Sequence, residues 1–595
     1  MNRKDVKTEY KWSLEDIFAT DGEWETAFAA FGKSAGSIAA FAGKLADRDK
    51  LIDCLKKSDE LDLEAERLYV YCNMRRDENA SVEKYVDMCD RMDGVMAKYQ
   101  SECAFVAPEL SSFPDERLDG LIADPEFADF SELFKEIRRK KAHILGEKEE
   151  KILAEASPAM GSFREIFGKI DYIDLDLPKI KDENGKRVKL TQGKYSACLN
   201  SQDAGVRKRA FTGLYKAYEA LINTLTATYA GSVKADNFYA TARGYKSALD
   251  KAMSGENVPE AVYKNLIAAV EKNVPALHRY VALRKEILGL DKLHMYDMYV
   301  PLTAETSEKY DFETAFSTVC EALSPLGSEY AELLRRAKTE RWMDVYETEN
   351  KRSGAYSWGC YGTHPFVLLN HEGTLHDVFT IAHELGHAMH SHYSNTALPH
   401  TKAGYAIFVA EVASTVNEVL TLKYLLGKAT DSATRKYLLG YYLDMFRTTL
   451  FRQTMFAQFE LIAHERAQNG MALTPKSLSD EYYKLNKKYY GPSVTHDRAI
   501  RFEWARIPHF YTAFYVYKYA TGITAAVNIA CDVLTGGEEA LGRYKRFLSA
   551  GGSDSPYEIL KAAGVDLATE KPFEIAMTEF SDTLAALKKE TESRS

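Results

Sequence analysis

Apolar residues recur at intervals of three and four over most of the chain, which is the spacing of amphipathic helices. Long stretches of this kind cover residues 51–99 and 206–225. Glycine and proline rarely interrupt them: the 595 residues include 35 Gly and 16 Pro, below the usual ~7% and ~5%. Residues 13–16, Ser-Leu-Glu-Asp, predict a capping box ahead of the first helical stretch. The pattern therefore predicts a mainly α fold.

Two segments depart from the helical pattern. Residues 170–195 alternate apolar and polar positions and contain an Asn-Gly pair, which predicts a β-hairpin with a tight turn. Residues 354–370 are rich in glycine and aromatic residues and predict a small β element just before a helix with two histidines. We expect an N-terminal helical region, residues 1–195, ending in the hairpin, and a catalytic domain, residues 196–595.

Composition narrows the class of protein. With 46% hydrophobic and 28% charged residues the chain has the profile of a soluble globular protein. The net charge of 77 − 87 = −10 disfavours nucleic acid as a partner. The first residues contain no apolar signal region and the chain no run of about 18 uncharged apolar residues, so we expect no membrane partner. Eight widely spaced cysteines without a CxxC pair favour reduced, mostly buried thiols and a cytoplasmic location.

One motif carries catalytic chemistry: residues 383–387 read His-Glu-Leu-Gly-His. On a helix His383 and His387 share one face, one turn apart, and can bind a single cation. Glu384 is rotated by one step, which suits a general base acting on a metal-bound water rather than a ligand. Thr374 with Asp377 predicts the start of this helix. The alternative is a helix whose two histidines only form hydrogen bonds in a core.

Catalytic zinc needs a third protein ligand. His390 lies on the same face, but about 10 Å along the axis from His383 at 1.5 Å per residue. The metzincin pattern HExxHxxGxxH requires Gly at position 390 and His at 393, where this chain has His390 and Tyr393. Neither route therefore supplies the third ligand.

A second helical segment, Phe-Val-Ala-Glu-Val-Ala-Ser-Thr-Val-Asn-Glu, supplies a better candidate. Glu411, 24 positions after His387, is the predicted third ligand. Glu418, one heptad later on the same face, is predicted to hold a zinc-bound imidazole by its other nitrogen. Asp377 is a weaker candidate for that second role. The alternative is that these are solvated or salt-bridged helix carboxylates.

Together these segments resemble oligoendopeptidase F, a branch of the thimet oligopeptidase-like zinc metallopeptidases. HELGHAMH, FVAEVASTVNE and RIPHFYTAFYVYKYATG carry the resemblance, and WSLEDIF, LPKIKDENGKRVKLTQGKYS and VRKRAFTGLYKAY extend it over most of the chain. The resemblance implies a large helical, clamshell-like body around a deep channel, one zinc ion per chain, and cleavage of short unstructured oligopeptides. It also implies that the strand-like residues 354–370 pair with the substrate backbone.

The tyrosine-rich segment after residue 508 has a chemical reason of its own. Attack on a peptide carbonyl creates an oxyanion, which neutral donors such as Tyr hydroxyls can stabilise. The resemblance of FYVY to the family's YYGY makes Tyr517 the best oxyanion donor, with His509 as a second catalytic group and Tyr511 and Tyr515 as substrate-binding residues. A Tyr-rich helix packed in the core is the alternative. The total of 37 Tyr also predicts polar-lined internal surfaces, because buried hydroxyls need partners.

The sequence thus predicts a zinc metalloendopeptidase with oligopeptide substrates, and leaves its oligomeric state open. A zinc exopeptidase is one alternative, for which Arg501, Arg506 or Lys518 could anchor a peptide terminus. A non-catalytic, peptide-binding helical protein is another. A P-loop or dinucleotide enzyme has no support, because neither GxxxxGK[ST] nor GxGxxG occurs.

Overall fold

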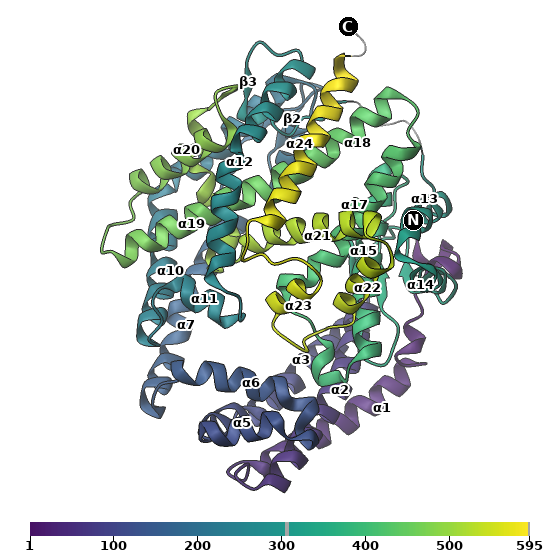
Figure 1. Cartoon of the computed structure of the whole chain (residues 1–595), viewed down its shortest axis with the longest axis vertical. Helices are drawn as coiled ribbons and strands as arrows, with labels where there is room; N and C mark the ends of the chain where they lie inside the picture. Colours follow the sequence, from purple (N-terminus) through teal and green to yellow (C-terminus); the bar gives the residue numbers. More distant parts are fainter. Residues whose placement is uncertain (304–308, 593–595) are drawn as a thin grey trace. The chain divides into compact units, whose positions relative to one another are not determined.

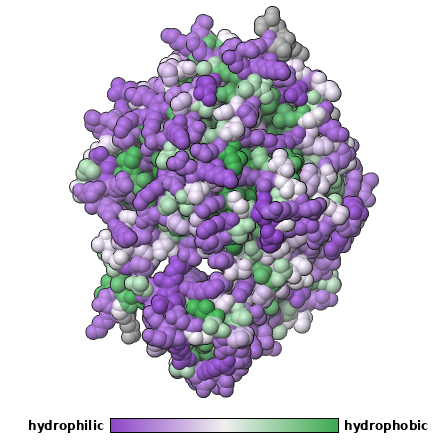
Figure 2. All heavy atoms as spheres, viewed as in Figure 1, coloured by the Kyte–Doolittle hydropathy of each residue, from purple (hydrophilic) through white to green (hydrophobic). Residues whose placement is uncertain are grey.

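The computed structural model describes residues 1–303 and 309–592, and this part of the chain is mainly α with a few small sheets (Figure 1). No helix in these residues is both long and apolar enough to cross a membrane. The face drawn in Figure 2 is covered mainly by hydrophilic residues, with hydrophobic ones scattered among them. Two compact units emerge, each assembled from three segments: Met1–Ala142, Ser307–Tyr424 and Ile529–Val565 form unit 1, and His143–Thr306, Leu425–Asn528 and Asp566–Ser595 form unit 2.

Unit 1 contains the N-terminal helices and the helices around the predicted metal motif. Its core joins aromatic residues near the N-terminus to the small sheet: Trp12, Trp24 and Phe366 are at most 2% exposed. Trp24 donates its indole hydrogen to the Leu68 carbonyl at 2.9 Å, so the buried polar atom is satisfied. The helices are α1 (Asp21–Ser34), α2 (Arg48–Glu78), α3 (Glu83–Cys103), α4 (Val106–Ser111), α5 (Asp115–Ala123), α6 (Ser131–Lys140), α13 (Phe312–Ala322), α14 (Ser328–Thr339), α15 (Leu375–Ala397), α16 (His400–Ala403), α17 (Ile407–Lys428), α22 (Gly537–Leu548) and α23 (Pro556–Ala562).

Unit 2 is likewise helical, and α21 runs from it into unit 1. An aromatic cluster forms part of its core, in which the ring of Tyr229 lies 6.2 Å from that of Phe459 and 5.9 Å from that of Trp504. The helices are α7 (Glu147–Lys169), α8 (Gln192–Leu199), α9 (Ala204–Ala220), α10 (Ile222–Ala242), α11 (Ala248–Gly255), α12 (Glu260–Ile287), α18 (Ser432–Met445), α19 (Arg452–Gln468), α20 (Pro475–Tyr490), α21 (Tyr517–Thr535) and α24 (Lys571–Glu592).

The sheets are short and lie where the helical pattern breaks. β1 (Lys179–Lys181) and β2 (Arg187–Lys189) form the predicted antiparallel hairpin, with Gly185 at φ 75° in its turn. β4 (Met343–Asp344), β6 (Phe366–Leu368) and β5 (Tyr356–Trp358) form a three-stranded sheet in that order, which confirms the β element before the histidine helix. β3 (Leu293–His294) pairs in parallel with β7 (Val494–Thr495).

The remaining predictions about the organisation of the chain are not confirmed by the structure. The capping box at residues 13–16 is wrong: Ser13 precedes only a 3₁₀ turn, Leu14–Asp16, and its side chain makes no cap hydrogen bond. The reason is tertiary, because the Ser13 N–H donates to the Arg341 carbonyl at 2.8 Å and the Asp16 carboxylate instead contacts His364 Nε2 at 2.9 Å. The division at residue 195 and the clamshell-like channel stay predictions.

Candidate metal centre and active site

The histidine motif lies in the middle of α15, as the capping signal predicts. The Thr374 hydroxyl accepts the N–H of Asp377 at 3.3 Å, and the Asp377 carboxylate accepts the N–H of Thr374 at 2.7 Å. This reciprocal pair satisfies two donors at the helix start and fixes where the helix begins. Asp377 is therefore engaged in the helix cap.

A glycine inside the motif lets α17 approach α15 closely. A Cβ atom on Gly386 would lie 2.5 Å from the Ser414 Cα and 2.7 Å from the Ala413 carbonyl oxygen, closer than real Cβ atoms come. Asn417 reinforces the approach, because its side-chain amide donates to the Ala382 carbonyl at 3.0 Å. The Gly in His-Glu-Leu-Gly-His thus helps to place Glu411 and Glu418 next to the histidines.

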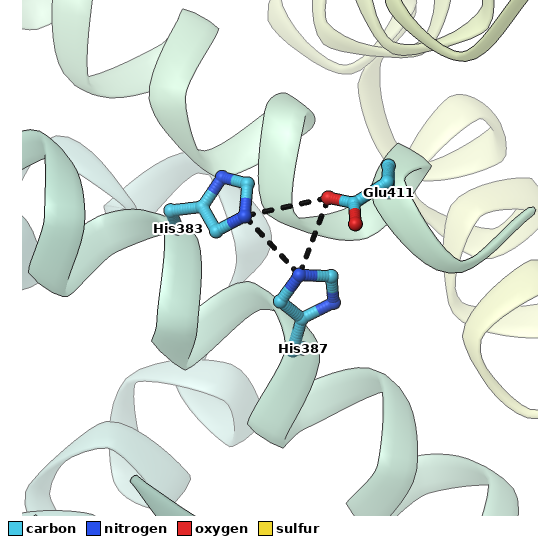
Figure 3. Close-up of side chains that lie close together, drawn as sticks. All are labelled: His383, His387 and Glu411. Atoms are coloured by element: carbon cyan, nitrogen blue, oxygen red, sulfur yellow. Dashed lines mark hydrogen bonds and ion pairs between the residues drawn. The ribbon is translucent and has the colours of Figure 1, made fainter. Parts of the chain in front are cut away.

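The three predicted ligands meet at one point (Figure 3). His383 Nε2 lies 3.2 Å from His387 Nε2, and Glu411 Oε2 lies 3.4 Å from the first and 3.3 Å from the second. Two donor atoms, each about 2.0–2.1 Å from a tetrahedral zinc ion, are about 3.3 Å apart. The donor spacing therefore fits zinc, and within residues 1–303 and 309–592 this is the one group of three or more such side chains close enough to hold a metal ion.

Glu418 orients the first of these ligands. Its Oε1 lies 2.6 Å from His383 Nδ1 and accepts the proton there, which leaves Nε2, on the side of the other ligands, to bind a metal ion. Burial lowers the pKa of His383, but hydrogen bonds with Glu411 and Glu418 outweigh it and raise the pKa to about 10. The two carboxylates that favour an imidazolium also favour a metal cation.

Glu384 is the unusual carboxylate of the site. It is 7% exposed, and its Oε2 is a buried atom that has no hydrogen-bond partner among the residues the structure describes. Burial raises the pKa of Glu384, which the neighbouring histidines partly oppose. Since buried polar atoms are nearly always paired, an unpaired carboxylate oxygen beside the histidines suits a group that acts on a substrate or water.

His390 is not part of this group, as its distance along the helix from His383 predicts. It is 1% exposed, and its ring stacks on that of Tyr405 with centroids 3.8 Å apart. Burial lowers the pKa of His390 to about 3, so the ring is neutral. It is a packed aromatic residue of unit 1.

In unit 2 the tyrosine segment separates into buried and accessible members. Tyr517 is 1% exposed, and its hydroxyl lies 3.4 Å from the Glu256 carboxylate, to which it donates. Tyr511 is half-buried, and its ring stacks on Phe167 with centroids 4.6 Å apart. These two predicted residues are held by contacts within unit 2.

His509 lies instead in a more exposed cluster with Tyr515 and Tyr519. The Tyr519 hydroxyl is 3.2 Å from His509 Nε2, and the rings of His509 and Tyr515 lie 5.7 Å apart. Burial, followed by the positive charge of Arg164, lowers the pKa of His509, so the ring is a neutral donor or acceptor at pH 7. Tyr519 was not among the predicted site residues. Its place in the tyrosine-rich segment, beside Tyr515 and Tyr517, is the signal that points to it.

Comparison with known proteins identifies the family to which this chain belongs. The profile of Peptidase family M3 matches residues 197–579, and that of Oligopeptidase F matches residues 109–176. The fold and the His-His-Glu site are those of a zinc metallopeptidase. The chain belongs to peptidase family M3, in the group of the oligoendopeptidases F.

Relatives resemble the chain over nearly its whole length. Oligopeptidase PepF of Bacillus subtilis is 42% identical over 98% of this chain and 87% of its own. The oligoendopeptidase F homolog of Lactococcus lactis is 38% identical over 99% and 98%. Among solved structures, oligoendopeptidase-F from Enterococcus faecium superposes with a TM-score of 0.75 at 33% identity, covering 96% of this chain and 99% of that one.

Proposed function

We propose that this metallopeptidase cleaves internal bonds of short unstructured oligopeptides, with one zinc ion per chain held by His383, His387 and Glu411. The observation that carries the proposal is the donor triangle with 3.2–3.4 Å sides beside the unpaired Glu384 oxygen. A silent, peptide-binding protein would have no need of that carboxylate.

Glu384 is the proposed general base and acid. A bound zinc ion supplies Lewis-acid chemistry, lowering the pKa of water and polarising the peptide carbonyl. Glu384 Oε2 accepts the proton of the attacking water and later delivers it to the leaving amine. Glu418 keeps the His383 ring in the tautomer that leaves Nε2 free to bind metal.

Donors for the oxyanion come from the 509–519 segment. Tyr517 and His509 are the proposed donors, and Tyr511 and Tyr515 the proposed substrate contacts. The contacts of the exposed His509 with the half-buried Tyr515 and Tyr519 support a role for His509. Tyr517 would have to exchange its contact with Glu256 for one with substrate.

The small sheet offers a place for the substrate backbone. β5 pairs with β6 on one side, and the sheet of the described residues ends with it. An extended peptide can add to such an edge through main-chain hydrogen bonds, which require no particular side chain. We infer broad sequence tolerance from this mode of binding.

The thiols bear on where the enzyme works. None of the eight cysteines, all of which lie in the described residues, forms a disulfide, and Cys54, Cys72, Cys89 and Cys360 are buried. Such a set persists in a reducing compartment, and we propose the cytoplasm.

A capped peptide tests the proposal. A nine-residue peptide with an acetylated N-terminus and an amidated C-terminus is incubated with the protein, with and without a chelator, and the products are identified by mass spectrometry. We expect internal cleavage that stops on chelation and returns with added zinc. Cleavage only of uncapped peptides, one or two residues from an end, would show an exopeptidase instead.

A further inference from the structure

Unit 2 contains a cavity of about 370 Å³. Its walls come from α8, α9, α19 and the 3₁₀ segment η11 (Arg498–Arg506). Of the residues that line it, Phe211, Tyr215 and Phe456 are at most 3% exposed, whereas Pro508 and His509 are exposed. Since one water takes roughly 30 Å³, the cavity can hold a side chain and not only a single ion.

Three charged side chains line this cavity: Arg452, Arg506 and Glu503. The Glu503 carboxylate is fully engaged. It accepts from Arg452 Nη2 at 2.7 Å and from the Tyr215 hydroxyl at 3.3 Å, and the Tyr482 hydroxyl donates to its other oxygen. The negative charge of the cavity is therefore matched by Arg452 and by two phenols.

Arg506 has no comparable partner. Its Nη1 is 3.9 Å from Glu503, its Nη2 is 3.4 Å from the Gln192 amide oxygen, and its Nε is a buried atom with no hydrogen-bond partner among the described residues. The guanidinium lies over the Tyr195 ring, 5.2 Å from its centroid. Its side chain is 20% exposed.

One further acid acts on Arg506 from outside the lining. Asp171 interacts with it electrostatically, but the Asp171 carboxylate is hydrogen-bonded by the Tyr218 hydroxyl. A guanidinium that is mostly removed from water and has only long contacts is costly unless a ligand completes its hydrogen bonds. Arginine in a stacked, fork-shaped setting is suited to carboxylates, which it binds through two parallel hydrogen bonds.

We infer that this cavity is a binding subsite for a carboxylate of the bound peptide, with Arg506 as its anchor. The carboxylate is either the side chain of an Asp or Glu residue or the C-terminal carboxylate. This inference rests on the proposed function, and His509 provides the link, because this proposed oxyanion donor also lines the cavity. A basic side chain would find the Glu503 carboxylate already engaged.

Matched peptides test the subsite without any mutation. The reference is the capped, neutral nine-residue peptide that the wild type cleaves; in its relatives one Gln at a time is replaced by Glu, and one further relative carries a free C-terminal carboxylate. We expect one position, or the free C-terminus, to raise kcat/KM on the order of tenfold, mainly through KM. The peptide whose kcat/KM rises identifies the source of the carboxylate.

Variants assign the preference to Arg506. Arg506→Gln should abolish the preference, so that the favoured carboxylate peptide and the neutral reference are cleaved with about equal kcat/KM. Arg498→Gln is the matched control, because Arg498 is an exposed arginine of the same segment outside the cavity lining. Gln453→Glu adds a carboxylate to the lining and should abolish the preference as well, which covers the case that Arg506→Gln does not fold.

Two results would overturn the subsite. One is a wild type that cleaves the neutral reference but prefers none of the carboxylate peptides. The other is a preference that persists in Arg506→Gln or in Gln453→Glu. Failure of the wild type to cleave any peptide would instead count against the proposed function.

Discussion

The metal centre and the 509–519 segment differ in what sets the directions of their side chains. At the metal centre two regular helices, α15 and α17, contribute every side chain, and helical periodicity sets their directions. In the 509–519 segment the chain passes through a 3₁₀ turn, Pro508–Tyr511, and then through Phe514 at φ 56° before α21 begins. No period describes that path, so the direction of each side chain depends on contacts with the rest of unit 2.

Glu460 shows what holds the irregular segment. This α19 carboxylate is 0% exposed, and its Oε1 accepts the Phe514 N–H at 2.7 Å. Burial raises the pKa of Glu460 well above its ordinary value. A bulky residue with positive φ is strained and persists only where its surroundings over-determine it. A buried acid 54 positions earlier in the chain thus helps to set the turn that precedes Tyr515 and Tyr517.

Loss of a metal ligand should have the largest effect. Glu411→Ala removes one corner of the donor triangle, so we expect the purified protein to lose its zinc and peptide turnover to fall to that of the chelated wild type. Metal analysis and a fluorogenic peptide assay measure both. Glu372→Gln, an exposed carboxylate just before α15, is the control and should keep both. Full zinc occupancy in Glu411→Ala would remove Glu411 from the ligand set.

A substitution in the 509–519 segment should have the next-largest effect on turnover. Tyr517→Phe removes one hydroxyl, and if that group donates to the oxyanion, kcat should fall about 10²–10³-fold. Tyr519→Phe is the matched comparison; its hydroxyl contacts His509, and we expect a smaller loss. The reverse order in kcat would transfer the oxyanion role from Tyr517 to the cluster of His509, Tyr515 and Tyr519.

Removal of the orienting carboxylate should be milder. Glu418→Ala deletes the acceptor for His383 Nδ1 but none of the three ligands. We expect zinc affinity or activity to fall about 10–100-fold, with a smaller loss in Glu418→Gln, which retains an acceptor oxygen. Zinc affinity measured by chelator competition checks this, and wild-type affinity in Glu418→Ala would contradict it.

The smallest effect concerns the turn itself. Because its pKa is raised in the folded protein, Glu460 stays protonated there while it ionises in the unfolded chain above about pH 4.3. The wild type should therefore lose stability relative to Glu460→Gln as the pH rises from 5 to 7. Calorimetric Tm values at several pH values measure the difference. A constant difference in Tm across that range would contradict the protonated state.

The same contrast explains how much could be predicted. The mainly α fold and the hairpin follow from hydrophobic periods of 3.6 and two residues. The metal triangle follows from the helical spacing of four between His383 and His387 and from the carboxylate of Glu411 on a second helical segment. The burial of Tyr517 does not, because α21 starts at that residue and its hydroxyl turns to Glu256 on another segment. The abundance of tyrosine is also partly resolved: buried hydroxyls such as those of Tyr280 and Tyr482 donate to the carboxylates of Asp444 and Glu503 inside unit 2.

The central claim is that Glu384 moves protons and does not bind the metal. Glu384→Gln keeps the size of the side chain and removes its basicity, so zinc content and turnover measured on one preparation separate the two roles. We predict close to one zinc per chain, as in the wild type, with turnover reduced by at least about 10²–10⁴-fold. Near wild-type turnover in Glu384→Gln, or loss of its zinc, would contradict the account.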